Sequence, residues 1–279
     1  MRQLPAPTPA FHWTHESWGV ALRCRPLSAV TQHGFTTRQL ALRGGMDVHP
    51  AEWASVAALV GVELDQLAGV RQVHGRAVRV LASGRIAAAV LERRPDADAI
   101  VSNERGLALV VQVADCVPIL LADRFTGVVG AVHAGWRGTA AGIVGEAVTA
   151  MRGLGSKPAN LVAALGPSIG PCCYEVGEEL VTAFLQAGHA RAQVDQWFSR
   201  VPRCSIVPAG RGGEMQGGEM SLRLDVAAAN HDQVVAAGVS AENVHVAGLC
   251  TQTHRDVFDS YRADGQTAGR MAAVIRVPN

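Results

Sequence analysis

A cysteine and two histidines, each at the end of a short apolar run, are the residues in this sequence best suited to chemistry. Cys116 follows the run 107–114, and His133 follows the run 127–132 in Gly-Ala-Val-His-Ala-Gly-Trp. His74 ends a third short run, in Arg-Gln-Val-His-Gly. In α/β proteins, strand ends expose side chains to ligand clefts. One thiolate and two imidazoles form a ligand set suited to zinc with one coordination position left open.

Each of these residues also has a purely structural interpretation, because cysteine is common in protein cores and a core histidine often bonds only to backbone. Against it, Asp115 lies beside Cys116, and an acid inside an apolar run needs a partner or a role. Gly135 and Gly138 leave the backbone after His133 bare, which suits close approach of a ligand. Cys116 and His133 could also be the nucleophile and base of a cysteine hydrolase.

The segment 135–139, Gly-Trp-Arg-Gly-Thr, leads into a predicted helix and carries Arg137. Free backbone N–H groups at a helix start attract anions, and an arginine adds a cationic fork for phosphate. The alternative is an ordinary strand-to-helix turn, since glycine turns before helices are frequent.

A second candidate segment is the loop 166–176, Gly-Pro-Ser-Ile-Gly-Pro-Cys-Cys-Tyr-Glu-Val. Ser168 is a weak candidate nucleophile, because its surroundings do not match Gly-x-Ser-x-Gly. Cys172 and Cys173 lack the Cys-x-x-Cys spacing of redox pairs, which favours structural packing.

Composition narrows the classes of protein. The 279 residues are 48% hydrophobic with a formal net charge of +1, which indicates a folded globular protein. We find no polybasic stripe, so neither nucleic acid nor a membrane is expected as a partner. Prolines near the N-terminus break any signal-peptide core, and no apolar run is long enough to span a membrane. We therefore expect a cytoplasmic protein whose 6 cysteines are reduced. The 10 histidines include no His-x-His, which argues against a multicopper centre.

Predicted strands and helices alternate along the chain, which favours a layered α/β architecture with a mixed sheet. Residues 1–16 are expected to be a loose leader, and 17–279 a single domain, since no composition break divides it. The glycine-rich stretch 212–220, with Gly-Gly-Glu-Met twice, predicts a flexible loop or a lid. The predicted strands are 18–24, 33–38, 70–73, 77–81, 97–101, 107–113, 117–121, 128–132, 161–165, 244–247 and 271–277. The predicted helices are 51–60, 138–151, 178–186 and 224–237.

Four motifs occur together and in order, and with them the chain resembles the YfiH family, also called polyphenol oxidoreductase (laccase) domain proteins or peptidoglycan editing factor. The motifs are Gln-Val-His-Gly at 72–75, Ala-Asp-Cys-Val-Pro at 114–118, Val-His-Ala-Gly-Trp-Arg-Gly at 132–138 and the loop 166–176. The resemblance runs from about residue 33 to residue 277.

The resemblance implies a single α/β sandwich and a zinc ion held by His74, Cys116 and His133, which are also the expected catalytic residues. It implies phosphorolysis of purine nucleosides, including adenosine, inosine and methylthioadenosine, together with adenosine deamination. Expected partners are therefore a purine nucleoside and phosphate, with Arg38 and Arg137 as substrate-binding residues; the oligomeric state is left open. The alternatives are a cysteine-type hydrolase or amidase in peptidoglycan precursor editing and a copper-dependent, laccase-like polyphenol oxidase.

The chain departs from the family pattern in two places. Relatives tend to carry Thr-Arg-x-Gly-Gly, whereas here Arg38 is followed by Gln-Leu-Ala-Leu-Arg-Gly-Gly. Relatives also tend to have Cys-Thr-x-Cys and then Phe-Phe-Ser-Tyr-Arg, where this chain has Thr253 and Asp259.

Overall fold

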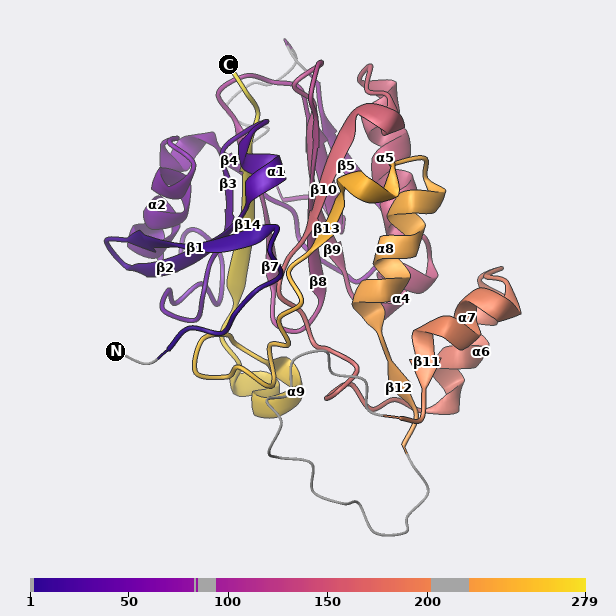
Figure 1. The fold of residues 1–279 in the computed structure, drawn as a ribbon. Helices are drawn as coiled ribbons and strands as arrows, with labels where there is room; N and C mark the ends of the chain where they lie inside the picture. Colours follow the sequence, from indigo (N-terminus) through magenta and orange to yellow (C-terminus); the bar gives the residue numbers. More distant parts are fainter. Residues whose placement is uncertain (1–2, 83, 85–93, 202–220) are drawn as a thin grey trace.

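The computed structural model describes residues 3–82, 84, 94–201 and 221–279. Two six-stranded mixed sheets pack face to face, and helices cover both outer sides (Figure 1). The layered α/β sandwich with mixed sheets that the sequence predicts is confirmed. The repeated Gly-Gly-Glu-Met stretch lies outside the described residues.

The first sheet has the strand order β1-β2-β3-β14-β7-β4. Its neighbours are antiparallel except β4 and β7, which are parallel. Its strands are β1 (Phe11–Glu16), β2 (Gly19–Cys24), β3 (His33–Phe35), β4 (Leu67–Ala68), β7 (Ala108–Val113) and β14 (Met271–Arg276).

The second sheet has the order β13-β10-β8-β9-β6-β5, with parallel pairs at its two edges. Every residue of its central strands β8 and β9 is buried, which is why both read as continuous apolar runs in the sequence. The strands are β5 (Val78–Leu81), β6 (Ala99–Ser102), β8 (Val117–Asp123), β9 (Val129–Ala134), β10 (Leu161–Leu165) and β13 (Val244–Val246); β11 (Phe198–Ser199) and β12 (Arg223–Leu224) form a separate pair.

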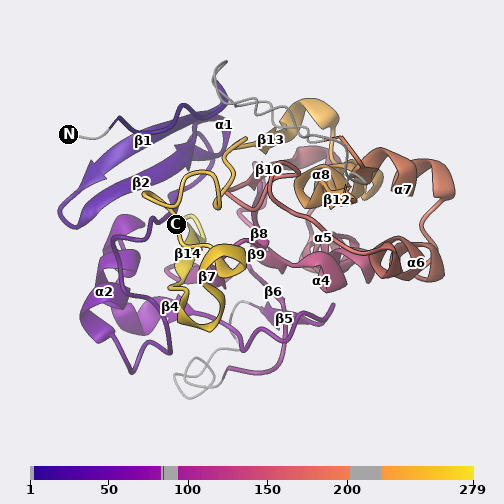
Figure 2. The same ribbon diagram turned by 90° about the horizontal axis from the view of Figure 1, so that it is seen from below.

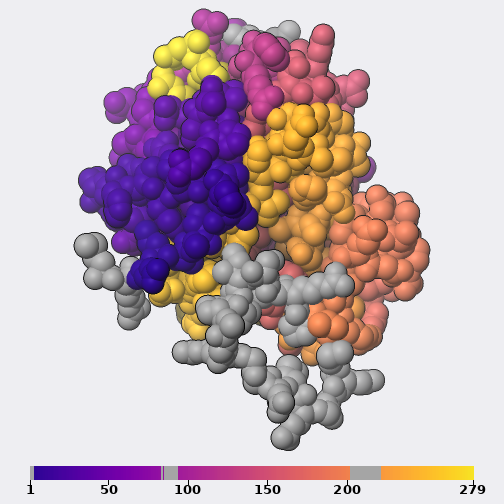
Figure 3. Space-filling view, in the orientation of Figure 1, coloured from indigo at the N-terminus to yellow at the C-terminus, as the bar shows by residue number. Residues whose placement is uncertain are grey.

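Helices form the outer layers, with α2 beside the first sheet and α5 and α8 beside the second (Figure 2). Helices α6 and α7 lie to one side of α8, at the edge of the molecule (Figure 3). The α-helices are α1 (Arg25–Ser28), α2 (Pro50–Leu59), α4 (Trp136–Ala140), α5 (Ile143–Gly153), α6 (Glu178–Gln186), α7 (Arg191–Trp197), α8 (Val226–Ala236) and α9 (Tyr261–Asp264). The 3-10 helices are Leu64–Gln66, Pro158–Asn160, Ala241–Asn243 and Gly265–Thr267.

Three apolar clusters hold these layers together. The cluster between the sheets includes Leu109 and Leu120, both fully buried. Met151 belongs to the cluster under α5 and α8, and Trp53 to the cluster under α2. Each such side chain contributes about 1.5–3 kcal/mol through removal from water.

The expectation of a loose leader over 1–16 is wrong for its second half, because Phe11–Glu16 forms strand β1, paired along its length with β2. Phe11 is buried and the Trp13 ring stacks on Phe258 at 6.0 Å. Thr8 is also fixed, since its hydroxyl donates to the carbonyl of Val246 at 2.6 Å. Strand β1 forms a hairpin with β2, and contacts with Val246 and Phe258, distant in sequence, hold this hairpin against the rest of the protein.

Two predicted elements differ in detail. Residues 70–73 form no strand, because the side chain of Gln72, rather than its backbone, pairs with Gln112 of β7. The predicted helix 138–151 is divided into α4 and α5 at Gly142, whose φ of +79° interrupts the helical backbone. Among the described residues, the structure contains no helix long and apolar enough to cross a membrane.

Candidate metal centre and substrate cavity

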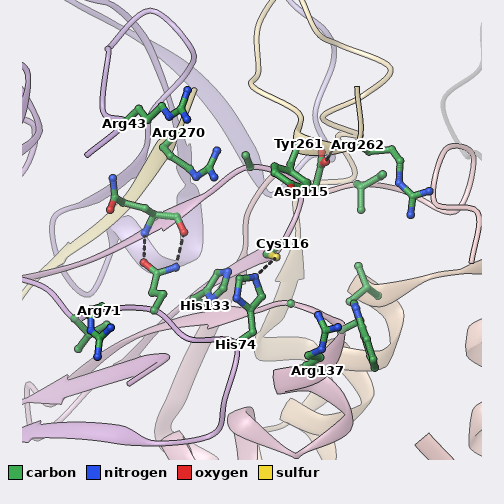
Figure 4. A pocket seen from close by; sticks show the side chains of 18 of the residues that line it. Arg43, Arg71, His74, Asp115, Cys116, His133, Arg137, Tyr261, Arg262 and Arg270 are labelled. Atoms are coloured by element: carbon green, nitrogen blue, oxygen red, sulfur yellow. Dashed lines mark hydrogen bonds between the residues drawn. The ribbon is translucent and has the colours of Figure 1, made fainter. Parts of the chain in front are cut away.

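His74, Cys116 and His133 come together at one end of the two sheets. One ligand atom from each lies within 4.8 Å of the others, and Cys116 Sγ is 3.9 Å from His74 Nε2 (Figure 4). The two imidazole rings meet edge to face, with centroids 4.8 Å apart. His133 is buried, Cys116 is half-buried and His74 is exposed, so the group is open to a ligand from one side.

Strand pairing explains why Cys116 and His133 meet. Cys116 lies in the connection between β7 and β8, and His133 lies near the end of β9. The antiparallel register of β8 and β9 places Pro118 opposite His133. A residue just before the start of β8 therefore lies next to the end of β9, although 17 positions separate the two residues in the sequence.

Asp98, which sequence reasoning missed, orients both histidine segments. Its Oδ1 lies 2.8 Å from Nδ1 of His133, which leaves Nε2 of His133 free to face Cys116. The same carboxylate accepts hydrogen bonds from the backbone N–H groups of His74 at 2.9 Å and Gly75 at 2.6 Å. The available sequence signal was an acid beside an apolar run, but nothing local identified its partners.

These contacts shift the ionisation of the group. Burial raises the pKa of the Cys116 thiol, but the charge of His133 and hydrogen bonds from both histidines outweigh it, and the pKa falls to about 6. Burial lowers the pKa of His133, but Cys116 and Asp98 raise it to about 9. Cys116 is therefore a thiolate near neutral pH, the form that binds metals or attacks as a nucleophile.

The loop carrying His74 is held in a strained conformation. His74 has a φ of +60°, and Asp115, next to Cys116, has a φ of +83°. Non-glycine residues adopt this left-handed region at a cost, and such residues gather at functional sites. Asp98 holds the His74 backbone, and the reciprocal bonds between Gln72 and Gln112, both 2.7 Å, fix the preceding turn to β7.

Gly135 and Gly138 are required for the close packing around the candidate metal ligands. A Cβ at Gly135 would lie 2.9 Å from Cys116 Sγ and 2.9 Å from Cδ2 of His74. A Cβ at Gly138 would lie 3.0 Å from the carbonyl oxygen of Gly75. Helix α4 can therefore approach the His74 loop only because both positions lack a side chain.

Asp115 points away from the metal ligands. Its carboxylate accepts hydrogen bonds from the Thr251 hydroxyl at 2.5 Å and from the Arg262 backbone N–H at 2.6 Å. The acid next to Cys116 therefore anchors the C-terminal loops around the site, and Asp98 takes the orienting role at the histidines.

A cavity of about 1080 Å³ opens over the cluster, larger than most small-molecule sites. Six arginines and one acid, Asp115, are among its described lining residues, and Arg71 is paired with Asp96 outside the lining. Figure 4 shows arginines on two sides of the cluster. The lining arginines are Arg43, Arg71, Arg94, Arg137, Arg262 and Arg270.

The two sequence-predicted arginines lie in different places. Arg137 lines the cavity, with its guanidinium 4.4 Å from the centre of the Trp136 ring. Helix α4 has only five residues, so Arg137, rather than a long helix dipole, supplies the positive charge there. Arg38 is not among the lining residues; its guanidinium lies 3.8 Å from buried Asp259 and donates to the carbonyl of Arg255. Arg38, which precedes the altered loop, therefore pairs with Asp259, one of the residues that depart from the family pattern.

The donor set fits a zinc ion. Two imidazoles and a thiolate are common zinc ligands, and three protein donors leave the open position typical of catalytic sites. The Asp98–His133 contact is the carboxylate–histidine arrangement that accompanies bound zinc in proteins. The same donors also suit copper, so the cluster establishes a possible metal site but not the identity of the metal.

The sheet order and the His/Cys/His cluster define a two-sheet α/β protein with a possible metal site. A sequence model described as "Multi-copper polyphenol oxidoreductase laccase" matches residues 48–278. The chain belongs to this family.

Two curated relatives and one solved structure are similar over most of the chain. "Purine nucleoside phosphorylase ORF3" of Streptomyces griseus is 36% identical over 91% of this chain and 97% of its own length. "Adenosine deaminase RL5" of an unknown prokaryotic organism is 34% identical over 77% of both. The crystal structure of the Bacillus licheniformis hypothetical protein YfiH superposes with a TM-score of 0.77 at 25% identity, covering 95% of this chain and 98% of that one.

Proposed function

We propose that this chain is a zinc-dependent purine nucleoside phosphorylase that acts on adenosine, inosine and methylthioadenosine and also deaminates adenosine. The observation that carries the proposal is the location of the His74, Cys116 and His133 cluster inside a large cavity lined by arginines. The names of the two curated relatives support the same pair of activities. His74, Cys116 and His133 would be both metal ligands and catalytic residues.

Phosphorolysis breaks the bond between the purine and C1′ of the sugar and forms a bond from C1′ to a phosphate oxygen. The departing purine takes up a proton, and the sugar phosphate is the second product. An arginine-rich wall favours this reaction, because it binds the phosphate anion and places it against the sugar. Arg137, on the side of α4, is our candidate phosphate-binding residue.

The remaining groups bind and orient. Trp136 and Tyr174 line the cavity and offer flat apolar surfaces to a purine ring. Asp98 accepts the Nδ1 proton of His133, so that Nε2 of the ring faces the cluster, and metal binding would displace the proton from Nε2. A bound zinc ion would supply a Lewis acid at the open coordination position. In deamination, water rather than phosphate is the co-substrate, C6 of adenine is the reacting carbon, and ammonia leaves.

Product analysis tests the phosphorylase proposal. Inosine incubated with the purified protein should give hypoxanthine and ribose 1-phosphate only when phosphate is present. Adenosine should give inosine by deamination, and adenine with ribose 1-phosphate by phosphorolysis. Equal release of hypoxanthine in phosphate-free buffer would indicate a hydrolase instead. The Cys116→Ala variant should lose both the metal of this cluster and the activity, while its circular dichroism spectrum shows that it remains folded.

One contact favours a second candidate, a cysteine-type hydrolase or amidase. Asp98, His133 and Cys116 are arranged as the orienting acid, base and nucleophile of such an enzyme, and the thiol pKa is lowered to about 6. The two candidates differ in their need for metal. A chelator should abolish nucleoside cleavage, whereas hydrolysis of an amide by Cys116 would survive chelation and be blocked by iodoacetamide.

Metal analysis distinguishes the phosphorylase from a copper oxidase. Within the part of the chain that the structure describes, the groups able to hold a metal are this cluster and a group of three cysteines, and neither offers the histidine sets of several coppers. We expect one zinc ion in this cluster, with phenol oxidation only after copper is added. Several tightly bound coppers, with phenol oxidation surviving copper-free dialysis, would contradict this.

A further inference from the structure

Three cysteines that the proposed reaction does not use form a second cluster. One ligand atom from each of Cys172, Cys173 and Cys250 lies within 4.8 Å of the others. The sequence favoured simple packing for the adjacent pair and gave no reason to associate Cys250 with it. The structure does associate them, and two of the three side chains are only half-buried.

Backbone pairing builds this cluster firmly. Ser168 and Cys250 form a parallel bridge, in which the Ser168 N–H donates to the Leu249 carbonyl at 3.2 Å and the Thr251 N–H to the Ser168 carbonyl at 3.0 Å. The Gly170 N–H points at Cys250 Sγ, 3.2 Å away. These bonds join the loop 166–175 to the turn that follows β13.

A fourth donor lies beside the three sulfurs. The hydroxyl of Thr253 is 3.4 Å from Cys173 Sγ and 3.6 Å from Cys172 Sγ. Four donor atoms, three of them sulfur, therefore lie close together, with Cys250 buried and the other two cysteines half-buried.

We propose that Cys172, Cys173 and Cys250 bind a thiophilic divalent cation such as zinc, with the Thr253 hydroxyl or a water molecule completing the coordination. Tetrahedral zinc with bonds of about 2.3 Å places its sulfur ligands about 3.8 Å apart. The three sulfurs lie within 4.8 Å of one another, so their separations need to shorten by no more than about 1 Å to reach that geometry. The cluster lacks imidazole, so it is a thiolate site unlike the His74 cluster.

The charge and the number of the sulfur atoms favour a bound cation over a disulfide or simple packing. Neighbouring thiolates repel one another, and a bound cation relieves this repulsion. A disulfide could join only two of the three sulfurs and would leave the third unused. Simple packing does not require three sulfurs and a hydroxyl to converge.

A cation here would fasten one wall of the cavity. The loop 166–175 carries Ile169 and Tyr174, which line the cavity. The turn after Cys250 leads through Thr251, the hydrogen-bond partner of Asp115. The site would therefore be structural, stabilising the loops around the His74 cluster.

Cadmium titration tests this site directly, because cadmium–thiolate bonds absorb in the ultraviolet. Reduced, metal-free Cys116→Ala protein isolates the second site from the first. We expect one cadmium ion to bind per chain, with the ultraviolet absorption of three cadmium–thiolate bonds. Added zinc should displace the cadmium and remove this absorption. Cys172→Ser and Cys250→Ser should each weaken binding at least tenfold. The matched control Cys24→Ala, a buried cysteine outside the cluster, should not change it.

A gain-of-affinity variant keeps the test independent of folding. Thr253→Cys should tighten cadmium at least tenfold and add the absorption of a fourth thiolate; no change would remove Thr253 from the coordination. The proposal is overturned if folded Cys116→Ala protein binds no cadmium, if Cys24→Ala weakens binding as much as Cys250→Ser, or if mass analysis finds a disulfide within the cluster in freshly purified protein. These outcomes do not depend on nucleoside cleavage.

Discussion

The carboxylate of Asp98 lies 2.8 Å from Nδ1 of His133 and also accepts the backbone N–H of His74 at 2.9 Å. One fully buried acid therefore orients two of the three residues in the candidate metal centre. Burial opposes ionisation of Asp98, but hydrogen bonds from His133, Gly75 and His74 outweigh it and lower its pKa. The acid thus remains charged while it holds the site.

Asp98→Asn should weaken metal binding at the His74 cluster by about 10–100-fold, the usual effect of removing such a partner. The new amide N–H₂ group cannot accept a hydrogen bond, yet it must face at least one of the N–H donors that Asp98 now binds. This repulsion should turn His133 or the His74 loop away from Cys116. Competition with a chelating dye would measure the affinity, in a Cys250→Ala background that removes the cysteine cluster.

Asp123→Asn is the matched control for this change. Asp123 is also buried and accepts backbone N–H bonds from Phe125, Thr126 and Lys157, but it lies outside the cavity lining. It should lower thermal stability without changing metal affinity. Equal loss of affinity in both variants would mean that Asp98 acts only through general stability.

Gly135→Ala should reduce metal affinity and nucleoside cleavage about tenfold or more while the fold persists. Its Cβ would meet both Cys116 Sγ and the His74 ring at 2.9 Å, closer than real Cβ contacts. Gly145→Ala in helix α5 is the control, since its Cβ would meet nothing within 4 Å. Unchanged metal affinity in Gly135→Ala would show that the ligands do not need this close approach.

Arg137→Ala should raise the KM for phosphate by about 10–100-fold and change the KM for the nucleoside less. A charge-assisted hydrogen bond contributes about 1.5–3 kcal/mol, which corresponds to that range. Arg191→Ala, an exposed arginine paired with Asp195 outside the cavity lining, should leave both constants unchanged. If phosphate saturation is the same in Arg137→Ala and the parent, another cavity arginine binds the anion.

The protein should lose stability in mild acid because of His33, outside the site. His33 is fully buried, accepts the Cys24 N–H at 2.9 Å, and has its pKa lowered by burial from 6.5 to about 4. Below pH 6.5 the unfolded chain takes up a proton that the folded chain does not, so stability falls as the pH drops from 6.5 towards 4. The expected loss is up to about 3 kcal/mol.

His33→Gln keeps an acceptor for Cys24 and removes this titration. We expect urea unfolding between pH 7 and pH 4 to show that the parent loses more of its free energy of unfolding than the variant does as the pH falls. A difference that stays constant over this range would exclude His33 as the cause.

Local sequence patterns determined most of the central architecture. The strands at Val117–Asp123 and Val129–Ala134 were predictable because both are buried on each face and thus read as apolar runs. Helix α6 was predicted with the bounds that it has, since its apolar face repeats at helical spacing. The first strand was missed although it forms a local hairpin with β2, because the prolines before it suggested a loose leader; its contact of Trp13 with Phe258 joins the two ends of the chain.

The sequence by itself determined which side chains could act as metal ligands, because the chemistry of His74, Cys116 and His133 belongs to each residue type and to its place at the end of a run. Only the tertiary structure decided their partners. Asp98 reaches His133 across the pairing of β6 with β9, and Arg38 faces Asp259 instead of the cavity. Cys250 meets Cys172 and Cys173 through a bridge at Ser168. These contacts depend on the order of strands in the sheets, which is set by the burial of whole layers and leaves no signal in neighbouring residues.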